Sequence, residues 1–128
     1  MVIIERLTCF IQFFIYIYTR TSGPPSEPMI NDISNVSYTV AVVSWEEGFH
    51  GGYDQTIHFK VRSNNDAWVE LTSVRVAKRE SKYRRTTTLR DLLPGTTYYI
   101  RLFASNERGS SGMTDIWNLT TKGSLFNL

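Results

Sequence analysis

The chain has 128 residues, about the length of one domain, and such a chain can bury roughly two thirds of its unfolded surface. Hydrophobic residues make up 41% and charged residues 20%, which is too apolar for a disordered chain and too interrupted for a protein that crosses a membrane several times. The formal net charge of +2 is too small to indicate a general binder of nucleic acid or anionic membranes.

The N-terminal stretch is an apolar run that reads L-T-C-F-I-Q-F-F-I-Y-I-Y from Leu7 to Tyr18. It contains the lone cysteine, Cys9, so the chain can form no internal disulfide bond and no thiolate-rich metal site. The run is too short to span a bilayer, which takes about 20 apolar residues. Its length suits the core of a secretory signal peptide, although no small-residue cleavage site follows. The alternatives are an exposed extension and a boundary artefact upstream of an excised domain.

A proline-rich stretch, T-S-G-P-P-S-E-P from Thr21 to Pro28, marks the start of the domain. Its prolines and glycine prevent helix formation and regular strand pairing. We therefore divide the chain into an irregular apolar N-terminal extension with its linker at 1–23, one domain at 24–122 and a short tail at 123–128.

From Pro28 to Thr121 the apolar residues alternate with period two and show no sustained period of 3.6, which predicts an all-β sandwich. Glycine-rich or polar turns separate the expected strands at Glu46 to Asp54, Ser63 to Asp66, Pro94 to Gly95 and Asn106 to Gly112. The strands are expected around residues 40–45, 57–62, 68–71, 86–89, 98–105 and 117–119. Their inward faces predict a core of Trp45, Ile57, Phe59, Val61, Leu89, Leu92, Tyr98, Ile100, Leu102, Trp117 and Leu119.

The segment L-L-P-G-T-T-Y-Y-I-R-L-F-A-S-N-E-R-G, which ends at Gly109, resembles the sixth-strand signature of fibronectin type III domains. Trp45, the triplet around Phe59 and the ending at Trp117, Leu119 and Thr121 resemble the second, third and last strands of that family. The resemblance covers about Pro24 to Lys122. It implies a seven-stranded antiparallel immunoglobulin-like β-sandwich without a disulfide, in which the hydroxyl of Tyr98 bonds back to the backbone near Leu92.

Two loops carry a finer resemblance. G-F-H-G-G-Y-D-Q-T, from Gly48 to Thr56, and F-A-S-N-E-R-G-S-S-G, from Phe103 to Gly112, are similar to the domain in nephrin-like immunoglobulin-superfamily adhesion receptors. This implies a non-catalytic module at the cell surface or secreted, acting as a spacer and binding other cell-surface immunoglobulin-superfamily proteins or neighbouring domains. No cofactor, nucleic acid or small-molecule substrate is implied. An intracellular scaffold of the muscle type is a further alternative.

Catalytic and metal-binding motifs are not recognisable in the chain. His50 and His58 belong to no hydrolase or metalloprotease motif. Glu46, Glu47 and Asp54 lack the spacing of a calcium loop, so we interpret them as a solvated acidic loop. The sequence therefore favours a binding module over an enzyme.

The strongest local charge is the basic segment R-V-A-K-R-E-S-K-Y-R-R, from Arg75 to Arg85. It predicts a matrix-type module that binds heparin-like glycans, as the alternative to protein binding. The competing interpretation is a solvated loop and edge strand whose charges discourage strand addition. The candidate glycan-binding residues are Arg75, Lys78, Arg79, Lys82, Arg84 and Arg85.

The candidate partner surface is the expected outward face of the third and sixth strands, because aromatic residues and arginine are enriched at protein interfaces. The competing interpretation is that these side chains only cover one another as cross-strand pairs. The candidate residues are Tyr99, Arg101, Phe103, His58 and Lys60.

Two sequons, N-V-S at Asn35 and N-L-T at Asn118, are candidate sites of N-glycosylation. Asn118 lies between the inward Trp117 and Leu119, which turns its side chain to solvent. Modification of either asparagine requires entry into the secretory pathway.

Overall fold

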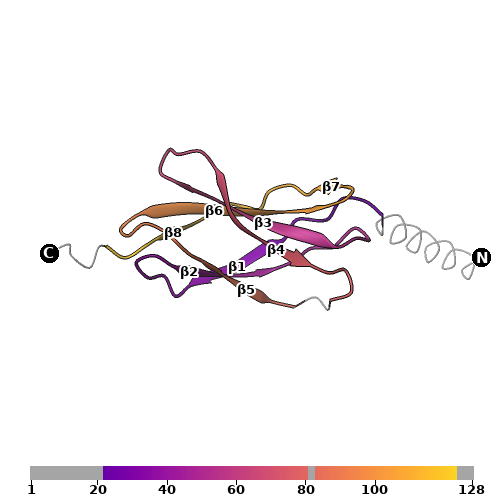
Figure 1. Cartoon of the computed structure of the whole chain (residues 1–128), viewed down its shortest axis with the longest axis horizontal. Helices are drawn as coiled ribbons and strands as arrows, with labels where there is room; N and C mark the ends of the chain where they lie inside the picture. The colour runs from indigo at the N-terminus through magenta and orange to yellow at the C-terminus, as the bar shows by residue number, and fades with distance from the viewer. Residues whose placement is uncertain (1–21, 81–82, 124–128) are drawn as a thin grey trace, which may run out of the picture.

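A computed structural model describes residues 22–80 and 83–123, and the predicted apolar segment with Cys9 lies outside these residues. Within these residues all regular secondary structure is β-strand, as Figure 1 shows. The strands are β1 (Met29–Ser34), β2 (Ala41–Glu46), β3 (Gln55–Ser63), β4 (Val69–Val76), β5 (Arg85–Leu89), β6 (Thr97–Asn106), β7 (Gly109–Ser110) and β8 (Trp117–Thr120).

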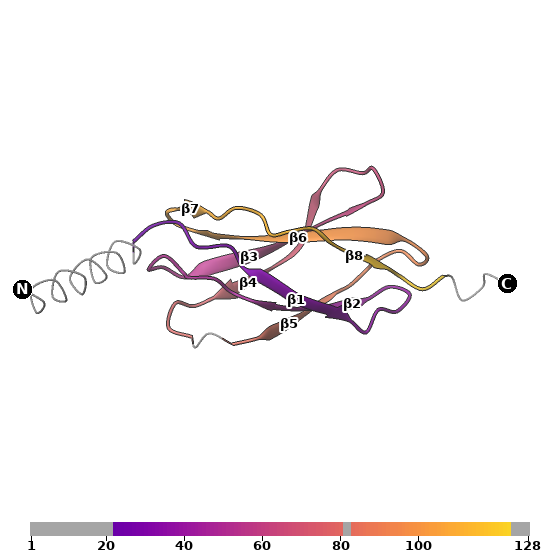
Figure 2. The same cartoon turned by 180° about the vertical axis from the view of Figure 1, so that it is seen from behind.

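The strands form two antiparallel sheets that pack face to face. One sheet has the order β1-β2-β5, and the other has the order β4-β3-β6, with β7 and β8 pairing with β6 in succession. Figures 1 and 2 show the two layers from opposite sides, with the described chain entering at one end of the long axis and leaving at the other. The prediction of an all-β sandwich is confirmed.

The structure has eight strands where the family resemblance implied seven, because the last strand is interrupted between β7 and β8. Along this gap two side-chain hydroxyls take the place of backbone carbonyls. Oγ of Ser111 accepts a hydrogen bond from the backbone N–H of Ala104, and Oγ1 of Thr114 accepts one from that of Leu102, both at 2.9 Å. The edge of β6 thus stays hydrogen-bonded although the facing chain is irregular.

Strand alternation brings the large apolar side chains into one core between the sheets. Trp45 and Phe59 meet edge to face with ring centroids 5.7 Å apart, and the indole N–H of Trp45 donates to Oγ1 of Thr87 at 2.8 Å. Trp117 is half-buried and packs at the rim of the core. The buried apolar side chains are Ile30, Ala41, Val43, Trp45, Ile57, Phe59, Val61, Val76, Leu89, Leu92, Tyr98, Ile100, Leu102, Ala104 and Leu119.

The turn before β6 is held by the phenol of Tyr98. Its oxygen accepts a hydrogen bond from the backbone N–H of Leu93 at 2.7 Å, next to the position that the resemblance implied. The N–H of Leu92 donates to the carbonyl of Thr39 at 3.0 Å. These two bonds fix the β5–β6 connection at the exit end of the sandwich.

The entry segment before β1 is irregular, as its prolines predict, and it is tied to two loops. The Asn106 amide donates to the carbonyls of Gly23 and His50, both at 2.9 Å. Gly51 has a φ of +73°, and a Cβ there would lie 2.1 Å from the Gly23 carbonyl oxygen. Glycine at this position is therefore required by the close approach of the entry segment.

Candidate functional site

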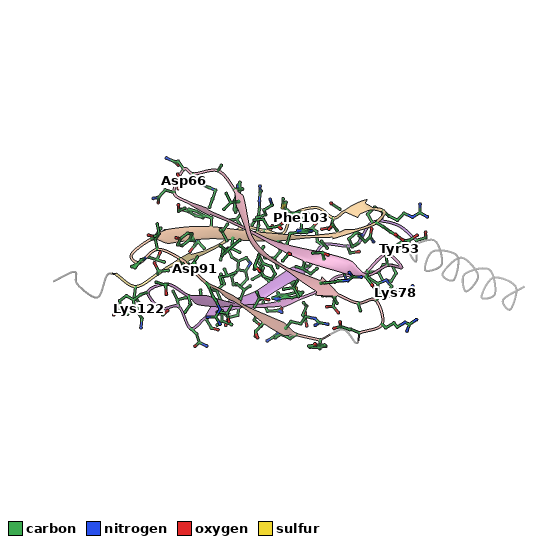
Figure 3. The ribbon with its side chains drawn as sticks, in the orientation of Figure 1. Tyr53, Asp66, Lys78, Asp91, Phe103 and Lys122 are labelled. Atoms are coloured by element: carbon green, nitrogen blue, oxygen red, sulfur yellow. The ribbon has the colours of Figure 1, made fainter. Side chains whose placement is uncertain are left out.

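The outward side of β3 and β6 carries alternating rings and cations. Cross-strand pairing sets His58 opposite Phe103, Lys60 opposite Arg101 and Arg62 opposite Tyr99. Figure 3 shows Phe103 on the side of β6 that faces away from the other sheet. We call this surface, together with Trp68 and Glu70 from the neighbouring hairpin, the ring–cation face.

Trp68 lies immediately before β4 and joins the two arginines of the ring–cation face. Cζ of Arg101 lies 4.2 Å from a Trp68 ring centroid, and Cζ of Arg62 lies 5.2 Å from it. Arg62 also lies 4.6 Å from the ring centroid of Tyr99. Tyr99, Arg62, Trp68 and Arg101 thus alternate as ring, cation, ring and cation. Within residues 22–80 and 83–123, neither guanidinium lies in an ion pair.

Trp68 was expected inside a short strand, and its contacts with both arginines were not predicted. Its position just outside β4 escapes period-two reasoning, because a residue in a hairpin loop has no fixed face. The nearby S-N-N-D turn was the available signal, since it makes β3 and β4 antiparallel neighbours and brings Trp68 close to Arg62.

His58 is clamped at the other end of the ring–cation face. Its ring stacks on Phe103 with centroids 4.4 Å apart, Nδ1 lies 2.6 Å from Oε1 of Glu70, and Nε2 lies 2.7 Å from Oγ of Ser105. A carboxylate, an imidazole and a serine hydroxyl in this order resemble the chain of groups in serine hydrolases. Ser105, however, pairs with both Thr56 and Ser110, so its backbone lies within the sheet and offers no exposed turn for an oxyanion hole.

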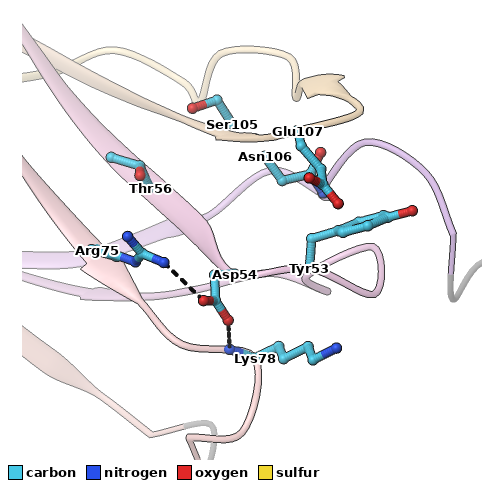
Figure 4. A pocket seen from close by; sticks show the side chains of 8 residues that line it. All are labelled: Tyr53, Asp54, Thr56, Arg75, Lys78, Ser105, Asn106 and Glu107. Atoms are coloured by element: carbon cyan, nitrogen blue, oxygen red, sulfur yellow. Dashed lines mark hydrogen bonds and ion pairs between the residues drawn. The ribbon is translucent and has the colours of Figure 1, made fainter.

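The basic segment does not form one surface. At its first end, Nη2 of Arg75 lies 3.0 Å from Oδ2 of Asp54, whose other oxygen accepts the backbone N–H of Lys78 at 2.9 Å. The bond from Lys78, followed by that from Arg75, holds the pKa of the Asp54 carboxyl below its ordinary value. Together with Tyr53 these residues line an open hollow of about 460 Å³, shown in Figure 4.

At its other end, the basic segment turns Arg85 toward the interior. Arg85 pairs with Trp45 across β2 and β5, so the two side chains share the inner face of the sheet. Its Nε lies 2.9 Å from Oε2 of Glu47 and its Nη2 lies 2.8 Å from Oε2 of Glu80, while the Arg85 and Glu47 side chains are only 12% and 6% exposed.

This burial by itself would lower the pKa of Arg85, but the hydrogen bonds to Glu80 and Glu47 outweigh it and raise the pKa. The Glu80 pKa is correspondingly lowered, first by Arg85 and then by the backbone N–H of Ala77.

The expectation that Glu46, Glu47 and Asp54 form a solvated acidic loop is wrong for Glu47, whereas Asp54 is exposed, as expected, but ion-paired. Glu47 is buried in its pair with Arg85, and Asp54 is bound by Arg75. Their partners lie far away in sequence, so local composition could not reveal them. Of the six candidate glycan-binding residues, Lys78, Arg79 and Arg84 are exposed, Arg75 is exposed but ion-paired, Arg85 is ion-paired with its side chain only 12% exposed, and Lys82 lies outside the described residues.

Both sequons lie on the surface. Asn35 follows β1 in a loop and has a φ of +49°, and Asn118 lies in β8 opposite Tyr99. His50 lies in the β2–β3 loop, where its Nδ1 accepts the backbone N–H of Gly52 at 2.7 Å. Over residues 22–80 and 83–123, no three His, Cys, Asp or Glu side chains lie close enough to hold a metal ion. In the same ranges, no helix has the length and hydropathy needed to cross a membrane.

Comparisons with known proteins agree with this architecture. The chain is 32% identical over 103 residues to the chicken (Gallus gallus) cell adhesion molecule DSCAM, covering 77% of this chain and 5% of that relative. It therefore spans about a twentieth of the relative's length. The solved structure of the titin kinase and its flanking domains matches with a TM-score of 0.62 at 21% identity, covering 79% of this chain and 18% of that one.

The three-domain structure of chicken CNTN1 FN1–FN3 matches with a TM-score of 0.59 at 22% identity, covering 78% of this chain and 33% of that one. At these identities the structural matches show the fold alone. Residues 26–118 match the family model of the fibronectin type III domain, which covers more than half of the chain. The chain therefore belongs to the fibronectin type III domain family.

Proposed function

We propose that the chain is a non-catalytic extracellular module of a cell-adhesion or cell-surface receptor protein. It binds other proteins through the ring–cation face and acts as a spacer between its neighbours. Similarity to the adhesion molecule DSCAM supports the cellular setting, and the ring–cation face carries the assignment of a binding role.

The binding role rests on a difference between the two outer surfaces of the sandwich. Rings and guanidinium groups, the side chains enriched at binding hot spots, gather on the outside of β3 and β6. The outside of the other sheet pairs Val42 with Thr88 and Ser44 with Thr86, which are small side chains. Aromatic rings and guanidinium groups are thus concentrated on the outside of β3 and β6, which favours that side as the binding surface.

The spacer role rests on the path of the chain. The described chain enters and leaves at opposite ends of the long axis (Figure 2), so neighbouring domains would be separated by the length of the sandwich. The entry segment is held by the Asn106 amide, and Gly95 at the exit end donates its N–H to the carbonyl of Lys122. Both ends are thus attached to the body of the domain by hydrogen bonds.

The test is adhesion of beads coated with the full chain to cultured cells. We expect Phe103→Ser to abolish bead binding, because it removes the ring that stacks on His58 and lies on the partner surface. Leu93→Ser is the matched control, since Leu93 is 65% exposed but lies in the turn before β6. Urea denaturation of each variant establishes that it is folded.

Arg101→Ala provides a second variant in case Phe103→Ser does not fold. Equal binding by the wild type and by folded Phe103→Ser and Arg101→Ala chains would contradict the proposed surface. Wild-type beads that adhere to no cell type would contradict the adhesion role itself. Glycan binding through the basic segment stays a prediction, and no contact in the described residues favours it.

A further inference from the structure

We propose that Asn118 carries an N-linked glycan and that its first N-acetylglucosamine packs on the ring of Tyr99. The modification rests on the extracellular setting proposed above. The packing rests on the geometry of β6 and β8, which brings the sequon and an aromatic ring side by side on the outer surface.

The sequon lies on an accessible strand. β8 pairs only with β6 in the sheet, so its other edge is unpaired within the described structure. Alternation turns Leu119 into the core and Asn118 outward, and the Asn118 side chain is exposed. Thr120, which completes the sequon, is also exposed. An oligosaccharide on Asn118 therefore meets no steric obstacle from the sheet.

Tyr99 is the cross-strand neighbour of Asn118. The next pair, Tyr98 opposite Leu119, is buried, which confirms that Tyr99 and Asn118 share the outer side. Directly opposed residues of antiparallel strands have Cβ atoms about 4.5–5.5 Å apart. A sugar joined to the Asn118 amide nitrogen is therefore within reach of the Tyr99 ring.

The two sides of Tyr99 have different neighbours. Arg62 approaches from β3 and lies 4.6 Å from the ring centroid. β8 flanks β6 on the side opposite to β3, so Asn118 and Arg62 approach Tyr99 from opposite sides of the strand. A pyranose ring presents a C–H-rich face that gains dispersion energy against an aromatic surface. We therefore expect the first sugar to make an apolar contact with the Tyr99 ring on the β8 side, away from Arg62.

The proposed modification is the transfer of an oligosaccharide to the amide nitrogen of Asn118. The Asn118 amide nitrogen attacks the anomeric carbon of an oligosaccharide held on a lipid pyrophosphate. A carbon–nitrogen bond forms, the sugar–phosphate carbon–oxygen bond breaks, the lipid pyrophosphate leaves, and the amide proton passes to the base of the transferase.

The glycan divides the ring–cation face. It covers the end formed by Tyr99 and leaves the end where Phe103 stacks on His58 uncovered. Partner binding through Phe103 and glycan packing on Tyr99 are therefore compatible, and each can fail without the other.

The first experiment measures occupancy. The full chain is expressed behind a heterologous signal peptide in a secreting mammalian cell, and its mass is determined before and after treatment with an N-glycosidase. We expect Asn118→Gln to remove one glycan, and Asn35→Gln is the matched control at the other sequon. A secreted chain whose Asn118 is unmodified overturns the proposal, even if the beads bind cells.

The second experiment measures packing through a double-mutant cycle. We expect Asn118→Gln to lower the thermal midpoint of the secreted chain by about 3 °C, as loss of a single modest contact would. In a Tyr99→Ala background the same substitution should cause no shift, because the ring is absent. Equal shifts in both backgrounds overturn the packing of the glycan on Tyr99.

Discussion

The arginines of the ring–cation face and those of the basic segment contact different kinds of side chain. In the ring–cation face, Arg62 and Arg101 lie over the rings of Trp68 and Tyr99. In the basic segment, Arg75 and Arg85 lie against carboxylates of Asp54, Glu47 and Glu80, and Arg85 lies over the Tyr83 ring as well. A carboxylate cancels the charge that it holds, whereas a neutral ring orients a guanidinium and leaves its charge available to an anionic partner. Within the described residues, Arg62 and Arg101 lie in no ion pair, whereas the charges of Arg75 and Arg85 are at least partly cancelled by their carboxylate partners.

The largest loss of stability is expected from removing one partner of the buried ion pair between Arg85 and Glu47. Arg85→Ala leaves the Glu47 carboxylate, 6% exposed, without its partner, and we expect the free energy of unfolding to fall by about 3 kcal/mol. Urea denaturation measures it. Arg75→Ala breaks the exposed pair with Asp54 and should cost less than about 1 kcal/mol. Similar losses in the two variants would show that the two pairs do not differ as their burial indicates.

Loss of the Trp68 ring, which lies between Arg62 and Arg101, should have an intermediate effect on the free energy of unfolding. Trp68→Ala removes the contacts with Arg62 and Arg101, and we expect the free energy of unfolding to fall by about 1–2 kcal/mol. Val69→Ala is the control, because Val69 is the next residue and is 54% exposed. A Trp68→Ala chain as stable as the control would mean that the rings do not hold the cations in place.

The same contrast explains how far the sequence could predict the structure. Alternation and turns define β2, β3 and β6, whose residues alternate between buried and half-buried over 41–46, 55–62 and 98–105. β1 offers no such pattern, since its pairing with β2 shifts in register between Ile30 and Asp32. Local patterns therefore locate regular strands well and irregular ones poorly.

The candidate site residues also fall into two groups, those that strand alternation predicts and those that only the three-dimensional fold brings together. Cross-strand neighbours such as His58 and Phe103 follow from strand faces, so the partner surface could be proposed from alternation. The pair between Glu47 and Arg85 joins residues 38 apart in sequence, and only the three-dimensional fold brings them together. Arg85 looks like part of an exposed basic run because its neighbours are basic, although strand alternation turns it inward opposite Trp45.

A smaller effect is expected on the salt concentration at which variants of the ring–cation face and of the basic segment elute from a heparin column. Lys60→Ala with Arg62→Ala and Lys78→Ala with Arg79→Ala each remove two positive charges, so net charge is matched between the variants. We expect the first pair to elute at lower salt than the second, because the ring–cation face presents its cations together. The reverse order would support the glycan-binding alternative for the basic segment.

The smallest effect concerns the exposed end of the basic segment. The pKa of the Asp54 carboxyl is lowered first by the backbone N–H of Lys78 and then by Arg75, so Asp54 binds a proton more weakly in the folded chain than in the unfolded one. Its contribution to stability is present above its ordinary pKa of 3.8 and is lost as the pH falls through the folded value.

In Asp54→Asn the position cannot titrate. We therefore expect the difference in urea midpoint between the wild type and this variant to shrink from about pH 7 to about pH 2, and to stay small because Asp54 is exposed. Glu80→Gln should behave in the same direction, since the pKa of Glu80 is lowered by Arg85 and by the Ala77 N–H. A midpoint difference that is constant over this range, or that grows in acid, would contradict the assigned direction and with it the bonds to Lys78 and Arg75.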